Sequence, residues 1–187
     1  MADVIVSETP EALAARVAAD FASLVAGVLE RQPRFTVALA GGSTPKLFYQ
    51  RLAKEPYRSS VPWSKMWFFF GDERCVPKDH PDSNFRMASE TLLQYVPVNS
   101  NHVHRMRGED PPPVAARDYE NTMRGIFGSA SEWPALDLML LGLGTDGHTA
   151  SLIPDTPALT PGDRWVVGNV VRSLQTVRIT MTLPVLN

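Results

Sequence analysis

The sequence predicts an α/β fold, a Rossmann-like three-layer sandwich in which helices cover both faces of a largely parallel central sheet. Three observations support this prediction. Short apolar runs alternate with amphipathic segments along the chain, as in folds built from successive strand and helix units. Several runs have almost no polar alternation, which suits parallel strands buried on both faces. Glycine-rich polar turns follow these runs directly, where ligands of open α/β sheets bind.

The first half of the chain supplies alternating strands and helices, which we expect at strand 4–6, helix 10–30, strand 35–40, helix 46–53, strand 66–70 and helix 84–95. The first helix has a clear start, because Thr9 suits the N-cap and Pro10 suits the first helical position. The Asp-Ser-Asn sequence at 82–84 can cap the last of these helices. This half therefore opens with repeated strand–helix units.

The second half continues the alternation, with elements expected at strand 102–106, helix 114–126 after a proline loop at 111–113, strand 136–143, and later strand candidates at 165–171 and 177–181. The order and pairing of these strands cannot be read from the sequence. The run at 136–143 is the most informative, because it leads directly into a turn that carries an acid and a histidine.

Composition limits the class of partner. With 187 residues and 44% hydrophobic content, we expect residues 1–187 to form one domain with one core. The 18 basic and 20 acidic residues give a formal charge of -2, which predicts neither nucleic acid nor anionic membrane as a partner. The single Cys75 excludes an internal disulfide and is compatible with a reducing cytosol. We find no signal-peptide pattern and expect no membrane span, so we predict a cytoplasmic protein.

The turn after the 35–40 run predicts an anion site. Gly41 and Gly42 permit unusual backbone angles. The hydroxyls of Ser43 and Thr44 can donate hydrogen bonds, and Pro45 suits the first turn of a helix. Unpaired backbone N–H groups and the positive end of a helix dipole favour phosphate, and the spacing matches neither a nucleotide P-loop nor a dinucleotide site. We therefore favour a phosphate on a small molecule, with an ordinary strand–helix turn as the alternative.

The turn after the 136–143 run predicts an active site. Asp146 and His148 lie there, and histidine exchanges protons near neutral pH while a nearby carboxylate can fix its tautomer. Gly142, Gly144 and Gly147 let the backbone turn sharply and approach a ligand closely. The alternative is a glycine-rich turn with a histidine that faces only solvent.

A charged cluster follows the 66–70 run. Arg74 can donate paired hydrogen bonds to a carboxylate or to a developing oxyanion. Asp72 or Glu73 would support its position. The alternative is an exposed charged loop.

Other polar residues have simpler interpretations. His102 and His104 could face a metal from one side of a strand, but no further ligand pattern accompanies them, so we predict no metal site. Cys75 lacks an identifiable base, and His80 lies in a proline-rich turn, so we expect neither to be catalytic. The aromatic residues at 66–70 are assigned to the core.

Three motifs occur in order along the chain: Ala-Leu-Ala-Gly-Gly-Ser-Thr-Pro at 38–45, Gly-Asp-Glu-Arg at 71–74 with Asp-Ser-Asn at 82–84, and Gly-Leu-Gly-Thr-Asp-Gly-His-Thr-Ala-Ser-Leu at 142–152. Together they resemble the 6-phosphogluconolactonase family, and the resemblance extends to the Arg-Ile-Thr segment at 178–180 and beyond. It implies a fold similar to the glucosamine-6-phosphate isomerase-like fold. It also implies a cofactor-free lactonase of the oxidative pentose phosphate pathway, which hydrolyses 6-phospho-D-glucono-1,5-lactone to 6-phospho-D-gluconate.

Glucosamine-6-phosphate isomerases/deaminases of the same wider fold family are the main alternative, because they share the phosphate loop and the Asp-Gly-His turn. Their histidine turn typically continues toward Asn-Glu-Pro, whereas this chain has Leu152-Ile153-Pro154. They usually carry Asp-Glu-Tyr where this chain has Asp72-Glu73-Arg74. Both departures favour the lactonase. A catalytically silent phosphosugar-binding module is the alternative from a different class.

The resemblance and the chemistry of the residues give each candidate a role. His148 would act as general base on water and later as general acid, with Asp146 orienting it. Arg74 would stabilise charge at the carbonyl, with backbone amides near Gly144 as further donors. Phosphate binding is assigned to Gly41, Gly42, Ser43 and Thr44 with Arg178 as a countercharge, and a supporting role to Asp72 and Glu73. The expected partner is a small phosphosugar lactone. Family members usually continue through another apolar strand and a terminal helix, which we expect residues 1–187 to lack.

Overall fold

Three parallel strands form the first sheet, in the order β2-β1-β4. The structure is a computed structural model that describes residues 3–128, 132–160 and 162–187. β1 (Phe35–Leu39) pairs with β2 (Met66–Phe70) along its whole length, and with β4 (Leu138–Met139) at two positions. The predicted strands at 35–40 and 66–70 and their parallel arrangement are confirmed.

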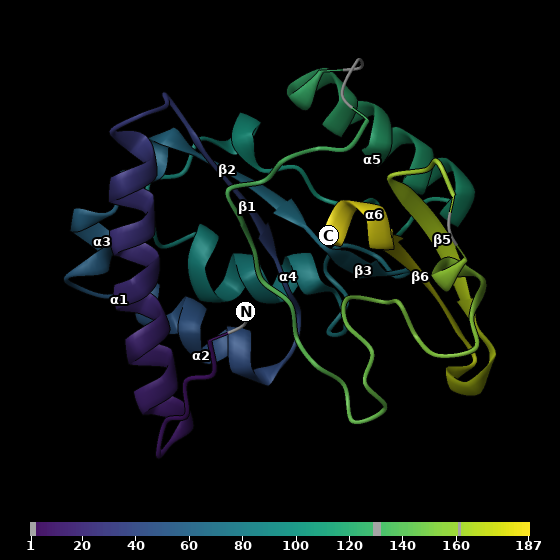
Figure 1. The fold of residues 1–187 in the computed structure, drawn as a ribbon, viewed down its shortest axis with the longest axis horizontal. Coiled ribbons are helices and arrows are strands. Elements are labelled where there is room, and N and C mark those ends of the chain that lie inside the picture. Colours follow the sequence, from purple (N-terminus) through teal and green to yellow (C-terminus); the bar gives the residue numbers. More distant parts are fainter. Residues whose placement is uncertain (1–2, 129–131, 161) are drawn as a thin grey trace.

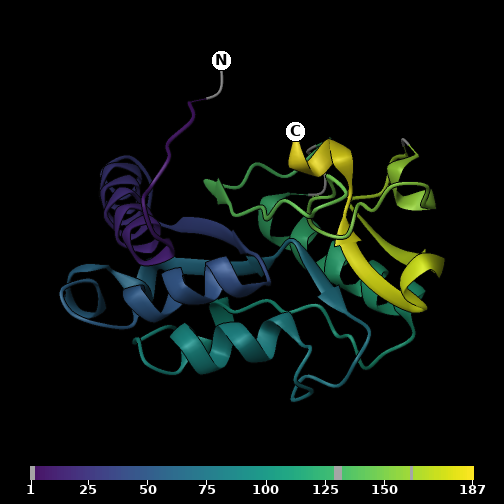
Figure 2. The same cartoon turned by 90° about the horizontal axis from the view of Figure 1, so that it is seen from below.

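Helices cover both faces of this sheet (Figures 1 and 2). The helices are α1 (Pro10–Leu29), α2 (Ser43–Leu52), α3 (Tyr57–Ser60), α4 (Asn84–Ala88), α5 (Pro112–Phe127) and α6 (Leu183–Leu186). Phe68 and Phe70 of β2 pack in the core on the side of α1 and α2, whereas Phe69 packs on the side of α5. Side chains of a strand alternate between faces, and here both faces are buried, as expected for covered parallel strands.

A second sheet of three strands is antiparallel, in the order β3-β6-β5. β3 (Asp72–Arg74) directly follows β2, while β5 (Val166–Val171) and β6 (Thr176–Met181) form a hairpin that packs on α5 (Figure 1). Both later strand candidates are therefore strands. This second sheet brings residues near 72 and 178 together at the edge of the first.

The remaining helical turns are short, at Trp63–Lys65, Ser89–Leu93, Ser100–His102, Pro157–Leu159 and Arg172–Leu174. The predicted helix at 84–95 is thus α4 followed by a π turn. The strand predicted at 102–106 is wrong, since only Val103 makes a bridge, to Phe68. The segment is otherwise a helical turn at Ser100–His102 and a loop, in which the His104 N–H donates to the Phe68 carbonyl at 2.8 Å.

Two further predicted strands differ from the structure. Residues 4–6 form no strand, and Val6 is 88% exposed. The run at 136–143 pairs only at Leu138–Met139 and is half-buried there, not buried on both faces. Among the described strands β4 has one neighbour, β1, so only one of its edges has a hydrogen-bonding partner.

Helix α1 is long and apolar enough, by length and composition alone, to cross a membrane, a test that the core helix of a globular protein also passes, so the expectation of no membrane span stays a prediction. Its start at Thr9 and Pro10 is confirmed, with the Ala12 N–H donating to the Thr9 hydroxyl at 3.1 Å. In this fold Phe21 and Val25 of α1 pack in the core, with the Phe21 ring against those of Phe35 and Phe48.

Candidate active site

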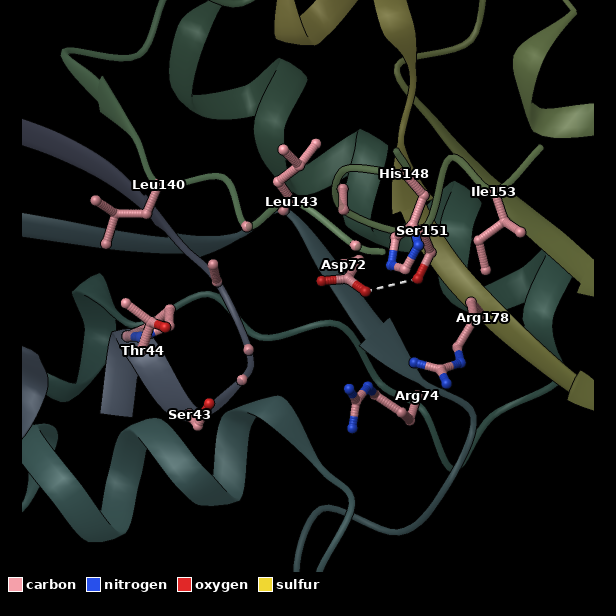
Figure 3. Close-up of a pocket in the computed structure, with 18 of the residues that line it drawn as sticks. Ser43, Thr44, Asp72, Arg74, Leu140, Leu143, His148, Ser151, Ile153 and Arg178 are labelled. Carbon is pink, nitrogen blue, oxygen red and sulfur yellow. Dashed lines mark hydrogen bonds between the residues drawn. The ribbon is translucent and has the colours of Figure 1, made fainter. Parts of the chain in front are cut away.

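A cavity of about 380 Å³ opens at the carboxyl ends of β1, β2 and β4, where the sequence predicts a ligand (Figure 3). Its lining residues are Ala40, Gly41, Gly42, Ser43, Thr44, Pro45, Gly71, Asp72, Arg74, Leu140, Gly142, Leu143, Gly144, His148, Ala150, Ser151, Ile153, Leu174 and Arg178. The three motifs, far apart in sequence, therefore share one cavity. Of the predicted site residues, Asp146 and Glu73 do not line it but contact residues that do.

The loop after β1 ends at the N-terminus of α2. Gly42 is the N-cap residue, with φ of 107°, a conformation that favours glycine, and Ser43 and Thr44 form the first turn of the helix. The first N–H groups of a helix have no acceptor within it, and they carry partial positive charge. This end of α2 faces the cavity (Figure 3), which agrees with the predicted anion site.

Tyr49 fixes the start of this loop. Its hydroxyl accepts from the Ala40 N–H at 3.0 Å and donates to the Ala40 carbonyl at 2.9 Å. Tyr49 is fully buried, and burial raises the pKa of its phenol, so the hydroxyl stays protonated and can donate. The backbone that enters the anion loop is therefore tied to α2 itself.

The turn after β4 is closed by its own backbone. The Gly144 N–H donates to the His148 carbonyl at 2.8 Å, and the Gly147 N–H, where φ is 84°, donates to the Gly144 carbonyl at 3.0 Å. A side chain at Gly144 would collide with the imidazole of His148. Glycine at this position therefore allows the imidazole to lie against the backbone of the turn.

This geometry changes the interpretation of Gly144. Its N–H is already donated within the turn, so in this conformation it does not face the cavity as an oxyanion donor. Gly144 lines the cavity and makes room for His148.

Asp146 and His148 form the predicted pair, with 2.5 Å between Asp146 Oδ1 and His148 Nδ1. The hydrogen bond from His148 is the main cause of the lowered pKa of Asp146, which keeps this carboxylate ionised. An ionised carboxylate only accepts, so Nδ1 carries the proton and Nε2 of a neutral imidazole is left as an acceptor. His148 lines the cavity, as Figure 3 shows, so this nitrogen is available to a ligand or water.

Two arginines approach the cavity from the second sheet. Arg74 of β3 and Arg178 of β6 are directly opposite partners in the antiparallel pair, and both line the cavity (Figure 3). The Arg74 Nη1 donates to the Asp82 carbonyl at 2.7 Å, while the buried Nε atoms of both arginines have no hydrogen-bond partner among the described residues. Burial first, and then the charge of Arg74, lower the pKa of Arg178. Two adjacent guanidinium groups in this setting favour an anionic ligand.

Asp72 is buried beside the cavity and links two loops. Its Oδ2 accepts from the Ser151 hydroxyl at 2.6 Å, and its Oδ1 accepts from the Asn84 side-chain amide at 3.1 Å. Neither contact was predicted from the sequence, in which Ser151 has no assigned role and Asn84 is expected only as part of a helix cap. The one available signal was their position, three residues after His148 and within the Asp-Ser-Asn sequence.

Glu73 supports the start of α4. Its carboxylate accepts from the backbone N–H groups of Arg74, Asn84 and Phe85 at 2.7–2.8 Å and from the Ser83 hydroxyl at 3.1 Å. Burial raises the pKa of Glu73, and these hydrogen bonds oppose that rise. The predicted supporting role therefore has a structural basis, which acts on the backbone next to Arg74.

The alternative candidates lie elsewhere. His102 and His104 contact the ring of Trp67, with centroids 4.3 and 5.5 Å apart, and the described residues contain no group of three potential metal ligands. Burial raises the pKa of Cys75 to about 11, which disfavours the thiolate that a nucleophile needs. Most side chains of the aromatic run at 66–70 are in the core, as expected.

Comparisons with known proteins identify the family. Residues 8–187 match the family model described as glucosamine-6-phosphate isomerases/6-phosphogluconolactonase. The chain is 48% identical over 155 residues to a 6-phosphogluconolactonase of Synechocystis, covering 81% of this chain and 62% of the relative. It is 45% identical over 162 residues to one of Nostoc, covering 85% and 65%. The chain thus spans less than two thirds of the length of these curated relatives.

Solved structures agree. A crystal structure of 6-phosphogluconolactonase from Thermotoga maritima matches with a TM-score of 0.80 and 32% identity, over 93% of this chain and 75% of that one. A monomeric glucosamine-6-phosphate deaminase has a TM-score of 0.75 but 18% identity over 98% and 77% of the two chains, which shows a shared fold alone. The chain belongs to the glucosamine-6-phosphate isomerase/6-phosphogluconolactonase family.

Proposed function

We propose that this protein hydrolyses 6-phospho-D-glucono-1,5-lactone to 6-phospho-D-gluconate in the oxidative pentose phosphate pathway, in the cytoplasm. The observation that carries the proposal is the pairing of His148 with Asp146 in a cavity that also contains a helix N-terminus and two arginines. The His148–Asp146 pair suits proton transfer to and from water, and the helix N-terminus and the two arginines suit a phosphorylated substrate. The names of the Synechocystis and Nostoc relatives support the same reaction.

In this mechanism Nε2 of His148 removes a proton from a water molecule that attacks the lactone carbonyl carbon. A tetrahedral intermediate forms, and the bond between this carbon and the ring oxygen then breaks. The imidazolium returns the proton to the ring oxygen, which becomes a hydroxyl, and the new carboxylic acid ionises. Asp146 keeps the proton on Nδ1 and stabilises the imidazolium. Water and these side chains supply every atom and proton, so the reaction needs no cofactor.

Arg74 stabilises the oxyanion that develops on the carbonyl oxygen. Its guanidinium is anchored through the Asp82 carbonyl, and Arg74 lines the cavity. A donor that is already positioned costs little reorganisation when the charge develops. The N–H of Gly144 does not share this role in this conformation, because it is donated to the His148 carbonyl within the turn.

The phosphate of the substrate binds at the N-terminus of α2, with Gly41, Gly42, Ser43 and Thr44 around it and Arg178 as the countercharge. Backbone N–H groups and hydroxyls at this position suit a dianion. A phosphate bound at one end of the cavity positions the carbonyl at the other, which raises the rate for phosphorylated over unphosphorylated lactones.

The test is hydrolysis of freshly generated 6-phosphogluconolactone, measured above the spontaneous rate, with His148→Ala in parallel. Rapid hydrolysis that depends on His148 supports the proposal. Ammonia released from glucosamine-6-phosphate, without lactone hydrolysis, would instead favour the deaminase. A folded protein that binds phosphate and accelerates neither reaction would be a binding module.

A further inference from the structure

Asn84 lies between the two sides of the cavity and contacts both. It is the first residue of α4, its side chain is 3% exposed, and it does not itself line the cavity. Its Nδ2 donates to the Asp72 carbonyl at 3.0 Å and to Asp72 Oδ1 at 3.1 Å. Its backbone N–H donates to Glu73 at 2.7 Å. Two hydrogen bonds from its side chain and one from its backbone therefore fix Asn84 on β3.

Toward the anion loop, Asn84 packs against Gly41. A Cβ atom at Gly41 would collide with the side-chain oxygen of Asn84, so the loop backbone and this amide are in close contact. The loop therefore follows the position of Asn84. The other side of the loop is tied to α2 through Tyr49 and the backbone of Ala40.

Toward the histidine turn, the connection runs through Asp72 to Ser151, at 2.6 Å. Ser151 is 1% exposed and lies three residues after His148. It is itself fixed, because its N–H donates to the Thr180 hydroxyl at 3.2 Å and its carbonyl accepts from the Asn169 side chain at 2.9 Å. A buried polar chain thus joins Gly41 to the segment that carries His148.

We propose that Asn84 is a positioning residue that sets the spacing between the anion loop and the His148 turn. The inference rests on the proposed function, in which one substrate contacts both loops. A substrate bound at both ends reacts only when the two ends are correctly spaced, and misplacement by about 1 Å can reduce the rate about 10²-fold. The buried hydrogen bonds that join Asn84 to Asp72 and Asp72 to Ser151 are well suited to fix such a spacing.

The first experiment compares Asn84→Ala with a matched control, Ser83→Ala. Ser83 is also buried at the start of α4, where its hydroxyl accepts from the Arg86 N–H and contacts Glu73, but it has no contact with Gly41 or Asp72 among the described interactions. We expect kcat for the phospholactone to fall at least about tenfold in Asn84→Ala and to stay within about threefold in Ser83→Ala. We expect inhibition by inorganic phosphate to change little in either. Equal kinetics of the two variants would overturn the inference.

A double-mutant cycle adds a readout that a purely structural role would not move. Asn84→Ala is combined with Ser43→Ala/Thr44→Ala, and kcat/KM for the phospholactone is measured. If Asn84 aligns the bound phosphate with the reacting carbonyl, the two changes affect the same step. The fold loss in kcat/KM of the combined variant should then be smaller, by about fivefold or more, than the product of the fold losses of the two separate variants. Losses that multiply would contradict it. Should Asn84→Ala fail to fold, Asn84→Leu retains the approximate side-chain volume and removes the Nδ2 donor without adding a charge beside Asp72, and the same results are expected.

Hydrogen exchange tests the connection without turnover. Inorganic phosphate should slow amide exchange at both 41–46 and 142–151 in the parent protein, but only at 41–46 in Asn84→Ala. Protection of both segments in the variant would overturn the inference. A parent protein that does not hydrolyse the phospholactone, yet shows this coupled protection, would overturn the proposed function and leave the role of Asn84 supported.

Discussion

The two turns of the cavity follow parallel strands and are both rich in glycine, but they are built differently. The turn after β1 leads into the ten-residue helix α2 and is tied to it through Tyr49. The turn after β4 leads into no helix, and its shape depends on its own backbone hydrogen bonds and on contacts of Ser151 with the second sheet. The first offers fixed N–H groups, and the second presents an ionisable side chain. This comparison suggests that one turn binds and the other turn reacts.

The largest expected effect is that of His148→Ala on the second turn. Removing a positioned acid–base group should lower kcat about 10²–10⁴-fold, while inhibition by inorganic phosphate stays within about twofold. Steady-state hydrolysis above the spontaneous background gives the first value. His102→Ala, which changes a histidine that stacks on Trp67 outside the cavity, is the control. Near-normal turnover would show that His148 is not the base and that the second turn does not carry the reaction.

A smaller effect is expected from Ser43→Ala/Thr44→Ala in the first turn. A hydrogen bond to a charged group contributes about 1.5–3 kcal/mol, and the backbone N–H groups of the loop remain in the variant, so we expect the net loss to be that of about one such bond and KM to rise between about tenfold and a hundredfold. kcat should change much less, because the reacting groups lie in the other turn. Substrate titrations separate the two constants. An unchanged KM with a lower kcat would show that the first turn acts in the reaction step and not in substrate binding.

Tyr49→Phe tests whether the first turn owes its shape to its link with α2. The change leaves the Ala40 N–H and carbonyl without the buried hydroxyl, so the free energy of unfolding should fall by about 1–3 kcal/mol. Urea denaturation followed by circular dichroism measures this change. Tyr95→Phe, at a half-exposed position, should stay close to the parent value. The same small loss in both variants would show that the hydroxyl does not stabilise the loop.

The smallest expected effect is on stability at acid pH. We attribute it to His104, which lies outside the cavity, and not to the His148 turn. Burial lowers the pKa of His104 below its ordinary 6.5, and the charge of His102 adds to this. Below pH 6.5 the unfolded chain therefore binds a proton before the folded protein does, so stability falls as the pH drops toward the folded-state pKa. Above pH 6.5 both states are neutral at this residue and no effect is expected. His104→Phe should flatten the dependence between pH 7.5 and 5.5 in urea denaturation, and an unchanged slope would exclude His104 as its origin.

Local signals were enough to predict the strands and turns that build the cavity. β1 and β2 appear as apolar runs, and the glycine turns after β1 and β4 mark the positions where backbone must approach a ligand. Because parallel strands place their carboxyl ends at one edge, the meeting of the anion loop and the His148 turn followed from the fold class. The pairing of Asp146 with His148 followed from their spacing of two residues.

Contacts between distant segments could not be predicted in the same way. Arg74 faces Arg178 only because β3 and β6 are antiparallel in one particular register, and no local pattern specifies that register. The hydrogen bonds of Asp72 with Ser151 and Asn84 span 79 and 12 positions. The apolar run at β4 predicted full burial, but Leu143 is 83% exposed, because hydropathy does not specify which neighbours a strand finds.

The most direct test of the account is the rate of 6-phosphogluconolactone hydrolysis by the parent protein and by His148→Ala, measured at saturating substrate and corrected for spontaneous hydrolysis. We expect a clear acceleration by the parent, a loss of about 10²-fold or more in kcat in the variant, and unchanged inhibition by inorganic phosphate. A folded parent protein that leaves the spontaneous rate unchanged, or a variant as active as the parent, would contradict it.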